Sequence, residues 1–486
     1  MAKQKQFVRP PKKSKVKSTT LETADDFQEA ADLEEEAGGK WRAGDPAKSG
    51  RAFVRALDLY DRGLRNHPGS FDLAYNKARL QLEITQRPLL IAHIGVPLED
   101  LLQQTLTSHR YALRLNEQNV DILFNTSQVL TSLAESLAER GDQSSAVGLL
   151  HEALELLSAC LSRQEMALEQ QQVDLEDLDE GGVSLEPDEQ LGANSSGDDV
   201  EETATVERLV TFTDLLDTVH ASLSALTTLV AFVEPGNLQT LADMAHSLTE
   251  TKAPAYLGLL AETEQLPARF ALALARAIFL AALADAQYNA MAIDLETYFV
   301  RLSAFDVAGR DTDAAAFTSE AEARAELVKS VLVRFETTGG LPMAVCWKEL
   351  STSQELLAKA AKIEGTAQVY LLRGDIELIR HRMATMAKSS LSASTQRSAA
   401  VLAANAHTYY KGAAKLSGGE LDDKGLEGRG KFWLVAALRS LLYGVAAVEV
   451  EPVPVDSREA ILRECVEESL IDASLAESVL QHVRGR

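Results

Sequence analysis

Apolar residues recur along most of this chain at the three- and four-residue spacing of amphipathic helices. The regular spacing begins near Trp41, and the alternation of Val, Ile and Thr that marks strands is nearly absent. Alanine and leucine dominate the apolar positions, whereas aromatic residues make up only 6% of the chain. The pattern therefore predicts an all-α protein built from many consecutive helices.

Helical periodicity is interrupted after the first third of the chain and resumes at Val206. Prolines stand at several later breaks, because proline lacks an amide N–H and its ring clashes with the preceding helical turn. The helices expected in this half are 206–232, 236–249, 254–263, 267–289, 291–304, 311–337, 343–363, 366–387, 392–416, 428–447 and 456–484, the last interrupted near Ile471.

A sequence repeat is clearest near the N-terminus. Gly44, Ala56, Tyr60, Gly63 and Pro68 stand 12, 4, 3 and 5 residues apart. In a helix pair, small residues let two helices cross closely, an aromatic ring fills the gap beside them, and proline ends the second helix. These residues and separations resemble the consensus of the tetratricopeptide (TPR) family, whose unit is a helix–turn–helix of about 34 residues.

Two longer repeats follow the first. A helix expected over 71–84 places Ala78 in register with Gly44, 34 residues later, and the motif Asp121–Asn125 echoes Asp72–Asn76. Together the three repeats cover roughly residues 37–160. The resemblance implies a right-handed superhelical solenoid of antiparallel helix pairs, with the first helix of each pair lining a concave groove.

The C-terminal half resembles the family more loosely. Tyr370–Asp375 is similar to the start of a first TPR helix, and its second helix is expected around Ala399–Tyr410. A separate α-helical domain is the alternative for this half. The expected organisation is a disordered tail (1–36, basic then acidic), TPR repeats (37–170), an acidic disordered loop (171–205), degenerate TPR-like repeats (206–450) and C-terminal capping helices (451–486).

The charge of the chain is large and unevenly placed. Lys and Arg number 48 and Asp and Glu number 72, for a net charge of −24, yet residues 1–17 hold seven basic residues and no acid. Twelve acids and no Lys or Arg lie between Asp174 and Glu202. An acidic body repels nucleic-acid phosphates and attracts basic partners, so a Lys/Arg-rich polypeptide is the expected partner, without direct nucleic-acid binding.

The basic tail bears on location. Pro10–Lys17 resembles a short nuclear-import signal, and a merely solubilising tail is the alternative. The start of the chain lacks the apolar core of a signal peptide. The most apolar stretch, Phe270–Ala284, is too short and too rich in alanine for a membrane span. A cytoplasmic and nuclear protein without membrane contact is therefore expected.

No pattern of catalytic residues emerges from the chain. Phosphate-binding loops, nucleophile elbows and metal-binding spacings are missing from the sequence, and the cysteines Cys160, Cys346 and Cys465 lie far apart. Unpaired cysteines of this kind suit a reducing compartment. We therefore expect no catalytic residue, cofactor or metal, and a binding protein rather than an enzyme.

The TPR resemblance also implies a partner-binding set, because in that family residues near the tryptophan position of the first helix, and one turn on, contact the ligand peptide. The Asn side chain can hold a peptide backbone, because its amide donates and accepts hydrogen bonds at the same time. For the aromatic residues Tyr75 and Phe124, the alternative role is packing between helices. The chain lacks the Lys and Arg set with which some TPR proteins clamp the acidic C-termini of chaperones. The implied positions are Trp41, Asp45, Tyr75, Asn76, Arg79, Glu83, Phe124, Asn125 and Gln128.

These features favour a chaperone or escort for a basic client, such as a ribosomal protein, acting in ribosome assembly or nuclear import. Acidic helical-repeat proteins of fungi include ribosomal-protein chaperones, which this chain resembles in architecture and charge. A structural scaffold subunit of a multiprotein complex is the alternative. The sequence leaves the client and the oligomeric state open.

Overall fold

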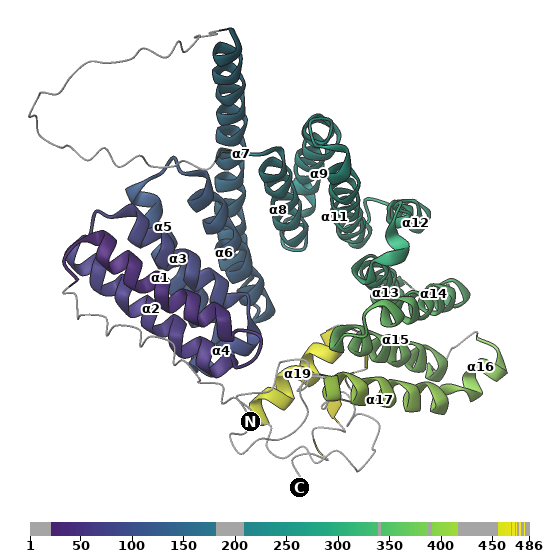
Figure 1. The fold of residues 1–486 in the computed structure, drawn as a ribbon. Helices are drawn as coiled ribbons and strands as arrows, with labels where there is room; N and C mark the ends of the chain where they lie inside the picture. Colours follow the sequence, from purple (N-terminus) through teal and green to yellow (C-terminus); the bar gives the residue numbers. More distant parts are fainter. Residues whose placement is uncertain are drawn as a thin grey trace, which may run out of the picture. The chain divides into compact units, whose positions relative to one another are not determined.

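The computed structural model describes residues 21–180, 209–338, 342–386, 391–416 and 455–467, with scattered positions between 469 and 481. Throughout these residues the regular structure is helical, as Figure 1 shows, and the predicted all-α class is confirmed. The chain divides into two compact units. Unit 1 comprises Met1–Ile94 and Thr107–Asn116, and unit 2 comprises Gly95–Leu106 and Glu117–Arg486.

Unit 1 is built from helices that begin at well-formed caps. The Thr23 hydroxyl and the Asp26 carboxylate form a capping box at the start of the first helix. Asp45 and Ser70 accept from backbone amides at the next two starts, which satisfies donors that a helix N-terminus leaves free. The helices are α1 (Ala24–Trp41), α2 (Pro46–Asn66), α3 (Phe71–Thr85), α4 (Pro88–Ile94) and the second half of α5 (Leu98–Leu115).

Helix α1 corrects two expectations from the sequence. It begins at Ala24, so helical order starts within the segment 1–36 that was assigned to a disordered tail. It ends at Trp41, so Gly44 lies in the turn before α2 and not in a first helix. Gly38 takes the close-packing role instead, because a Cβ there would overlap the ring of Phe53 on α2.

The remaining consensus residues of the first repeat lie as predicted on α2 and at its exit. Ala56 and Tyr60 are fully buried. A Cβ on Gly63 would come within 2.9 Å of Leu73, so this glycine lets α3 pack closely against α2. Pro68 follows the end of the helix at Asn66.

Unit 2 continues the alternation of paired helices. Helices α6, α8, α11, α13 and α15 contact one another in that order, and each packs on the helix or helices that follow it in the chain (Figure 1). The helices are α6 (Val120–Glu139), α7 (Gln143–Glu180), α8 (Phe212–Val230), α9 (Leu238–His246), α10 (Ala253–Leu257), α11 (Glu262–Asn289), α12 (Leu295–Leu302), α13 (Ala314–Thr338), α14 (Met343–Ile363), α15 (Ala367–Thr385), α16 (Ala393–Arg397), α17 (Ala399–Leu416) and α19 (Val455–Glu467).

Several predicted boundaries move in unit 2. Helix α7 runs to Glu180, so the first ten residues of the predicted loop 171–205 are helical. Helices α9 and α10 are joined by a π-helical turn, Ser247–Lys252, where separate helices were expected. The rest of the acidic loop up to residue 205 and the predicted helix 428–447 lie outside the described residues, as does the basic tail.

Two helices of unit 2 are long and apolar enough to span a membrane on length and composition alone: the Gln143–Val173 part of α7, and α11. Both contribute buried side chains to one hydrophobic core that also includes α8. A second core joins α11 to α13, α14, α15, α17 and α19. Helix α11 therefore belongs to both cores and connects them.

The pair of α15 and α17 shows what holds such helices together. Gly374 on α15 faces the buried ring of Tyr410 on α17, and a Cβ at position 374 would overlap that ring. The Tyr410 hydroxyl donates to Asp375 Oδ1 at 2.8 Å. The predicted start of a first helix at Tyr370–Asp375 and of its partner around Ala399–Tyr410 thus corresponds to two helices in direct contact.

We expect Gly374→Ala to destabilise unit 2 by roughly 1–3 kcal/mol, because overpacking forces the Tyr410 ring or the helix backbone to shift. Thermal and urea unfolding followed by circular dichroism measures the change. Gly148→Ala in α7 is the matched control, because a Cβ there meets nothing within 4 Å. It should be neutral or stabilise by up to about 1 kcal/mol, and equal effects of the two substitutions would contradict this account.

Candidate functional site

Trp41 and Asp45, the first two predicted binding residues, are engaged locally. Trp41 is the last residue of α1, and the Lys48 ammonium lies 3.2 Å from its ring centroid. Asp45 caps α2 by accepting from the Lys48 amide at 2.9 Å. Both side chains therefore serve the turn between α1 and α2.

The four predicted residues on α3 belong to a network of balanced charge. Tyr75 stacks on Phe71, one turn earlier on the same helix, with ring centroids 5.7 Å apart. Arg79 pairs with Glu35 at 2.5 Å and donates weakly to the Asn76 side chain at 3.4 Å.

Glu83, the acidic member of the four, is neutralised. It accepts from Arg42 at 2.5 Å and forms an ion pair with Arg87 at 3.4 Å, and Arg79 lies 4.0 Å away. This part of unit 1 therefore does not offer the unpaired negative charge that a basic client requires.

Phe124, Asn125 and Gln128 lie on α6 in unit 2 and are half-buried. Phe124 packs against the core shared with α8. Within the part of the chain that the structure describes, neither the Asn125 amide nor the Gln128 amide makes a hydrogen bond. Both amides are free to bind a ligand, and the binding role predicted for Asn125 and Gln128 stays a prediction.

A cavity of about 580 Å³ opens in unit 2 between α8, α11 and α13, and we call it the acidic cleft. Helix α11 lines it with one face, whose positions recur every three or four residues. Helix α13 does the same with Ser319, Glu322, Ala323 and Glu326. The face of α11 consists of Ile278, Ala281, Ala282, Asp285, Ala286 and Asn289.

The lining of the acidic cleft combines small apolar walls with three carboxyl groups and contains no Lys or Arg. Asp285 accepts from three neutral donors, at 2.6 Å from Ser330, 3.0 Å from Tyr298 and 2.9 Å from Asn289. Glu322 accepts only weakly, at 3.4 Å from Gln368.

Burial raises the pKa of the Asp285 carboxyl, and the bonds from Ser330 and Tyr298 only partly offset that rise. Burial likewise raises the pKa of Glu322, and the neighbouring Glu326 adds to the effect. Lys329 pairs with the exposed Glu326 at 2.7 Å. One ammonium therefore stands against three carboxyl groups.

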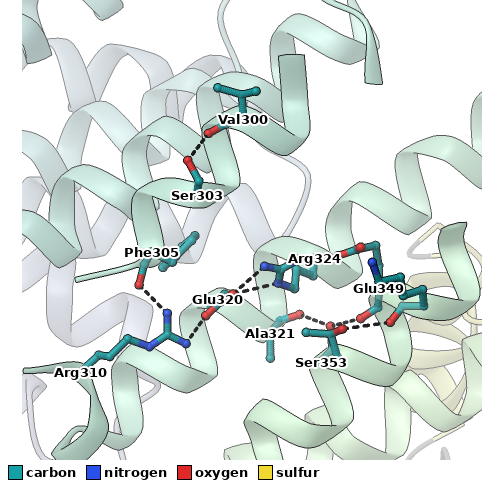
Figure 2. Close-up of polar contacts among 11 residues, drawn as sticks. Val300, Ser303, Phe305, Arg310, Glu320, Ala321, Arg324, Glu349 and Ser353 are labelled. Atoms are coloured by element: carbon teal, nitrogen blue, oxygen red, sulfur yellow. Dashed lines mark hydrogen bonds and ion pairs between the residues drawn. The ribbon is translucent and has the colours of Figure 1, made fainter. Parts of the chain in front are cut away.

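On the opposite side of α13, glutamate carboxylates are paired with arginine side chains. Glu320 is buried and bridges Arg310 and Arg324, and Arg324 also reaches the buried Glu349 on α14, as Figure 2 shows. Arg310 is held in turn by the Phe305 carbonyl at 2.7 Å. The same helix therefore pairs its acids with arginine on one side and leaves those facing the cleft without it.

The wider surroundings strengthen the negative field at the acidic cleft. Residues 117–180 and 209–338 together hold 31 acidic and 10 basic residues. A concave site lined by one sign of charge raises the local concentration of the opposite charge. Among the described residues no cluster of His, Cys, Asp and Glu is arranged to hold a metal ion. The negative field and the apolar walls of the cleft suit an organic cation.

Sequence reasoning missed Asp285, Glu322 and Glu326. The sequence pattern could have indicated them, because α11 and α13 both carry acidic residues on a helix face that is otherwise rich in alanine. A pattern of that kind also describes an ordinary exposed helix edge. Only the structure shows that the two faces meet.

Comparison with known proteins assigns no family to this chain. No family model matches the chain. A stretch of 162 residues is 36% identical to the UPF0656 protein C926.02 of Schizosaccharomyces pombe, and the match covers 33% of this chain and 35% of that relative. The chain therefore matches only about a third of that protein's length.

Two solved structures align with most of the chain at 11% identity. A circular tandem repeat protein with novel repeat topology matches over 95% of both chains with a TM-score of 0.27. Yeast Tom70 matches over 94% of this chain and 97% of its own, with a TM-score of 0.17. Scores this low carry no weight for the arrangement of this chain, whose assignment to helical repeats rests on its own helix pairs.

We expect Glu322→Gln to raise the free energy of unfolding by about 0.5–1 kcal/mol at pH 7.5, since it removes a half-buried charge that burial disfavours and that no arginine pairs. A carboxyl whose pKa is raised in the folded state stabilises the fold when protonated, and loses that contribution as pH rises through the folded pKa. The advantage of the variant should therefore disappear below about pH 4. Urea unfolding at both pH values measures it.

Glu320→Gln is the control, two residues away on the same helix. It weakens the pairing of two partly buried arginines and should destabilise by about 2–3 kcal/mol. Equal losses in the two variants would show that Glu322 is a structural carboxylate like Glu320.

Proposed function

We propose that this chain is a helical-repeat protein that binds a Lys/Arg-rich polypeptide in the acidic cleft. The observation that carries the proposal is the contrast along α13. Glu320 is paired with arginine, whereas Glu322, together with Asp285 across the cleft, has none. Partly buried carboxyl groups with raised pKa values cost stability, and such groups cluster at functional sites.

The chemistry of the acidic cleft suits lysine and arginine side chains. Their aliphatic stems can lie along the alanine-rich wall formed by residues such as Ala281, Ala282 and Ala286. The charged head then reaches the carboxylates of Glu322 and Glu326. Because water is partly excluded there, the attraction exceeds that of a fully exposed ion pair.

We further propose that the partner is a client that the protein escorts, such as a ribosomal protein during ribosome assembly or nuclear import. A net charge of −24 would shield a strongly basic client from nucleic acid until delivery. The basic segment Pro10–Lys17, which lies outside the described residues, would direct the complex to the nucleus. Such binding is electrostatic and should therefore weaken as salt rises.

The double substitution Glu322→Gln, Glu326→Gln should weaken binding of a Lys/Arg-rich peptide at least tenfold, equivalent to about 1.4 kcal/mol. Fluorescence anisotropy with a labelled peptide of alternating Lys, Arg and Ala measures the affinity. The control pair Glu262→Gln, Glu264→Gln changes net charge equally, but its exposed residues in the first turn of α11 lie outside the cleft. The control should weaken binding less than about twofold.

Equal losses in the two pairs would assign binding to overall charge and remove the cleft from the proposal. The escort role has its own test. Affinity capture from cells in low salt, followed by mass spectrometry, should recover a Lys/Arg-rich protein that is released as salt rises. Recovery of partners at fixed stoichiometry that resist salt would instead indicate a scaffold subunit.

A further inference from the structure

A second cavity, of about 240 Å³, lies on the opposite side of α11 from the acidic cleft, and we call it the α9–α12 pocket. Its floor includes Arg276, Leu280, Leu283 and Gln287, which follow one another by four, three and four residues and so share one face of the helix. Helix α9 and its π-helical turn form one wall. Arg301, near the end of α12, closes the other side.

The charge of the α9–α12 pocket is opposite in sign to that of the cleft. Arg276, Arg301 and His246 line it from three different elements. Asp243 is the single acid in the lining, and its carboxylate accepts a hydrogen bond of 2.7 Å from the Gln239 side-chain amide. Two permanent cations therefore converge on a small space in a region that is otherwise strongly acidic.

The two arginines are available to a ligand. Arg301 forms no ion pair with any residue that the structure describes. Arg276 pairs with Glu250 at 2.9 Å, but the two side chains are 45% and 43% exposed. Exposed pairs of this kind are weak and exchange partners easily, so an incoming carboxylate can replace Glu250.

Gln287 contributes a hydrogen-bond acceptor that lacks a donor. Its Oε1 atom is shielded from solvent and has no hydrogen-bond donor. A shielded acceptor without a donor destabilises the fold, so a ligand that brings an N–H or O–H gains by supplying it. A simple anion cannot do so. A polypeptide can, because each backbone amide is a donor.

We propose that the α9–α12 pocket receives the side chain of an Asp or Glu from a partner polypeptide. The carboxylate lies between Arg276 and Arg301, a backbone N–H of the same segment donates to Gln287, and a neighbouring apolar side chain covers the part-buried Leu280. The π-helical turn places Thr249 in the wall, and such turns are frequent at functional sites. The chain thus carries a site for acidic segments in addition to its site for basic ones.

Binding of blocked peptides to the full chain tests this proposal. The probe is a labelled peptide pool with a central Asp or Glu between Leu and Ala, random outer positions and both termini blocked. A second pool replaces the acid by Asn or Gln. The acidic pool should bind at least tenfold more tightly by anisotropy, and Arg301→Ala should remove at least tenfold of that affinity.

Arg269→Ala is the control, because Arg269 lies on the same helix but does not line the pocket. It should leave the affinity unchanged, and thermal melts verify that both variants fold. Equal binding of the two pools, or no binding of either up to about 1 mM, overturns the proposal. A third pool, whose sole acid is a free C-terminal carboxylate, overturns the side-chain assignment if it alone binds.

This proposal does not depend on the acidic cleft. Glu322→Gln with Glu326→Gln should leave affinity for the acidic pool unchanged, and Arg301→Ala should leave affinity for the basic peptide unchanged. Failure of one site is therefore distinguishable from failure of the other.

Discussion

One hydrogen bond recurs in three of the helix pairs that the structure describes: a fully buried tyrosine of one helix donates to a carboxylate of its partner. Burial raises the pKa of Tyr60 and of Tyr298 above the usual value, so these phenols keep their protons and remain donors. An aromatic ring in such a position also requires a small residue opposite, as Gly374 provides for Tyr410. The pairs are Tyr60 with Glu35 (2.7 Å), Tyr298 with Asp285 (3.0 Å) and Tyr410 with Asp375 (2.8 Å).

Asp285 takes part both in one of these hydrogen bonds and in the proposed binding site. It accepts from Tyr298 on the side of α12 and also lines the acidic cleft between α11 and α13. Its position is thus held by the packing of one helix pair, while no Lys or Arg lines the cleft beside its carboxylate. A carboxylate fixed by neutral donors needs little rearrangement on binding a cation, which lowers the entropic cost of association.

Much of the fold could be predicted from sequence, because helical periodicity and proline breaks act locally. The register of the first repeat could not. Ala56, Tyr60 and Gly63 all belong to α2, so they describe the packing face of the second helix alone. The first helix is positioned by Gly38 against Phe53, and the consensus spacing pointed to Gly44 instead.

The candidate site was harder to predict than the fold, for an electrostatic reason. Glu320 and Glu322 lie two residues apart on one helix, yet only Glu320 meets arginine, because Arg310 precedes α13 on the same side. Whether a glutamate is compensated depends on groups brought in by other elements. The predicted residue Glu83 shows the reverse case, since its charge is balanced by arginines that the repeat pattern did not take into account.

The π-helical turn between α9 and α10 has a geometric consequence. An α-helix turns by about 100° per residue, so one extra residue in a wide turn rotates everything beyond it by about that angle. Before the turn, His246 faces the α9–α12 pocket. After it, Tyr256 reaches Glu165 on α7, to which Lys252 at the end of the turn also bonds at 2.8 Å. A single-residue insertion thus lets one short stretch of chain serve two neighbours in different directions, and its loss would turn the later side chains away from α7.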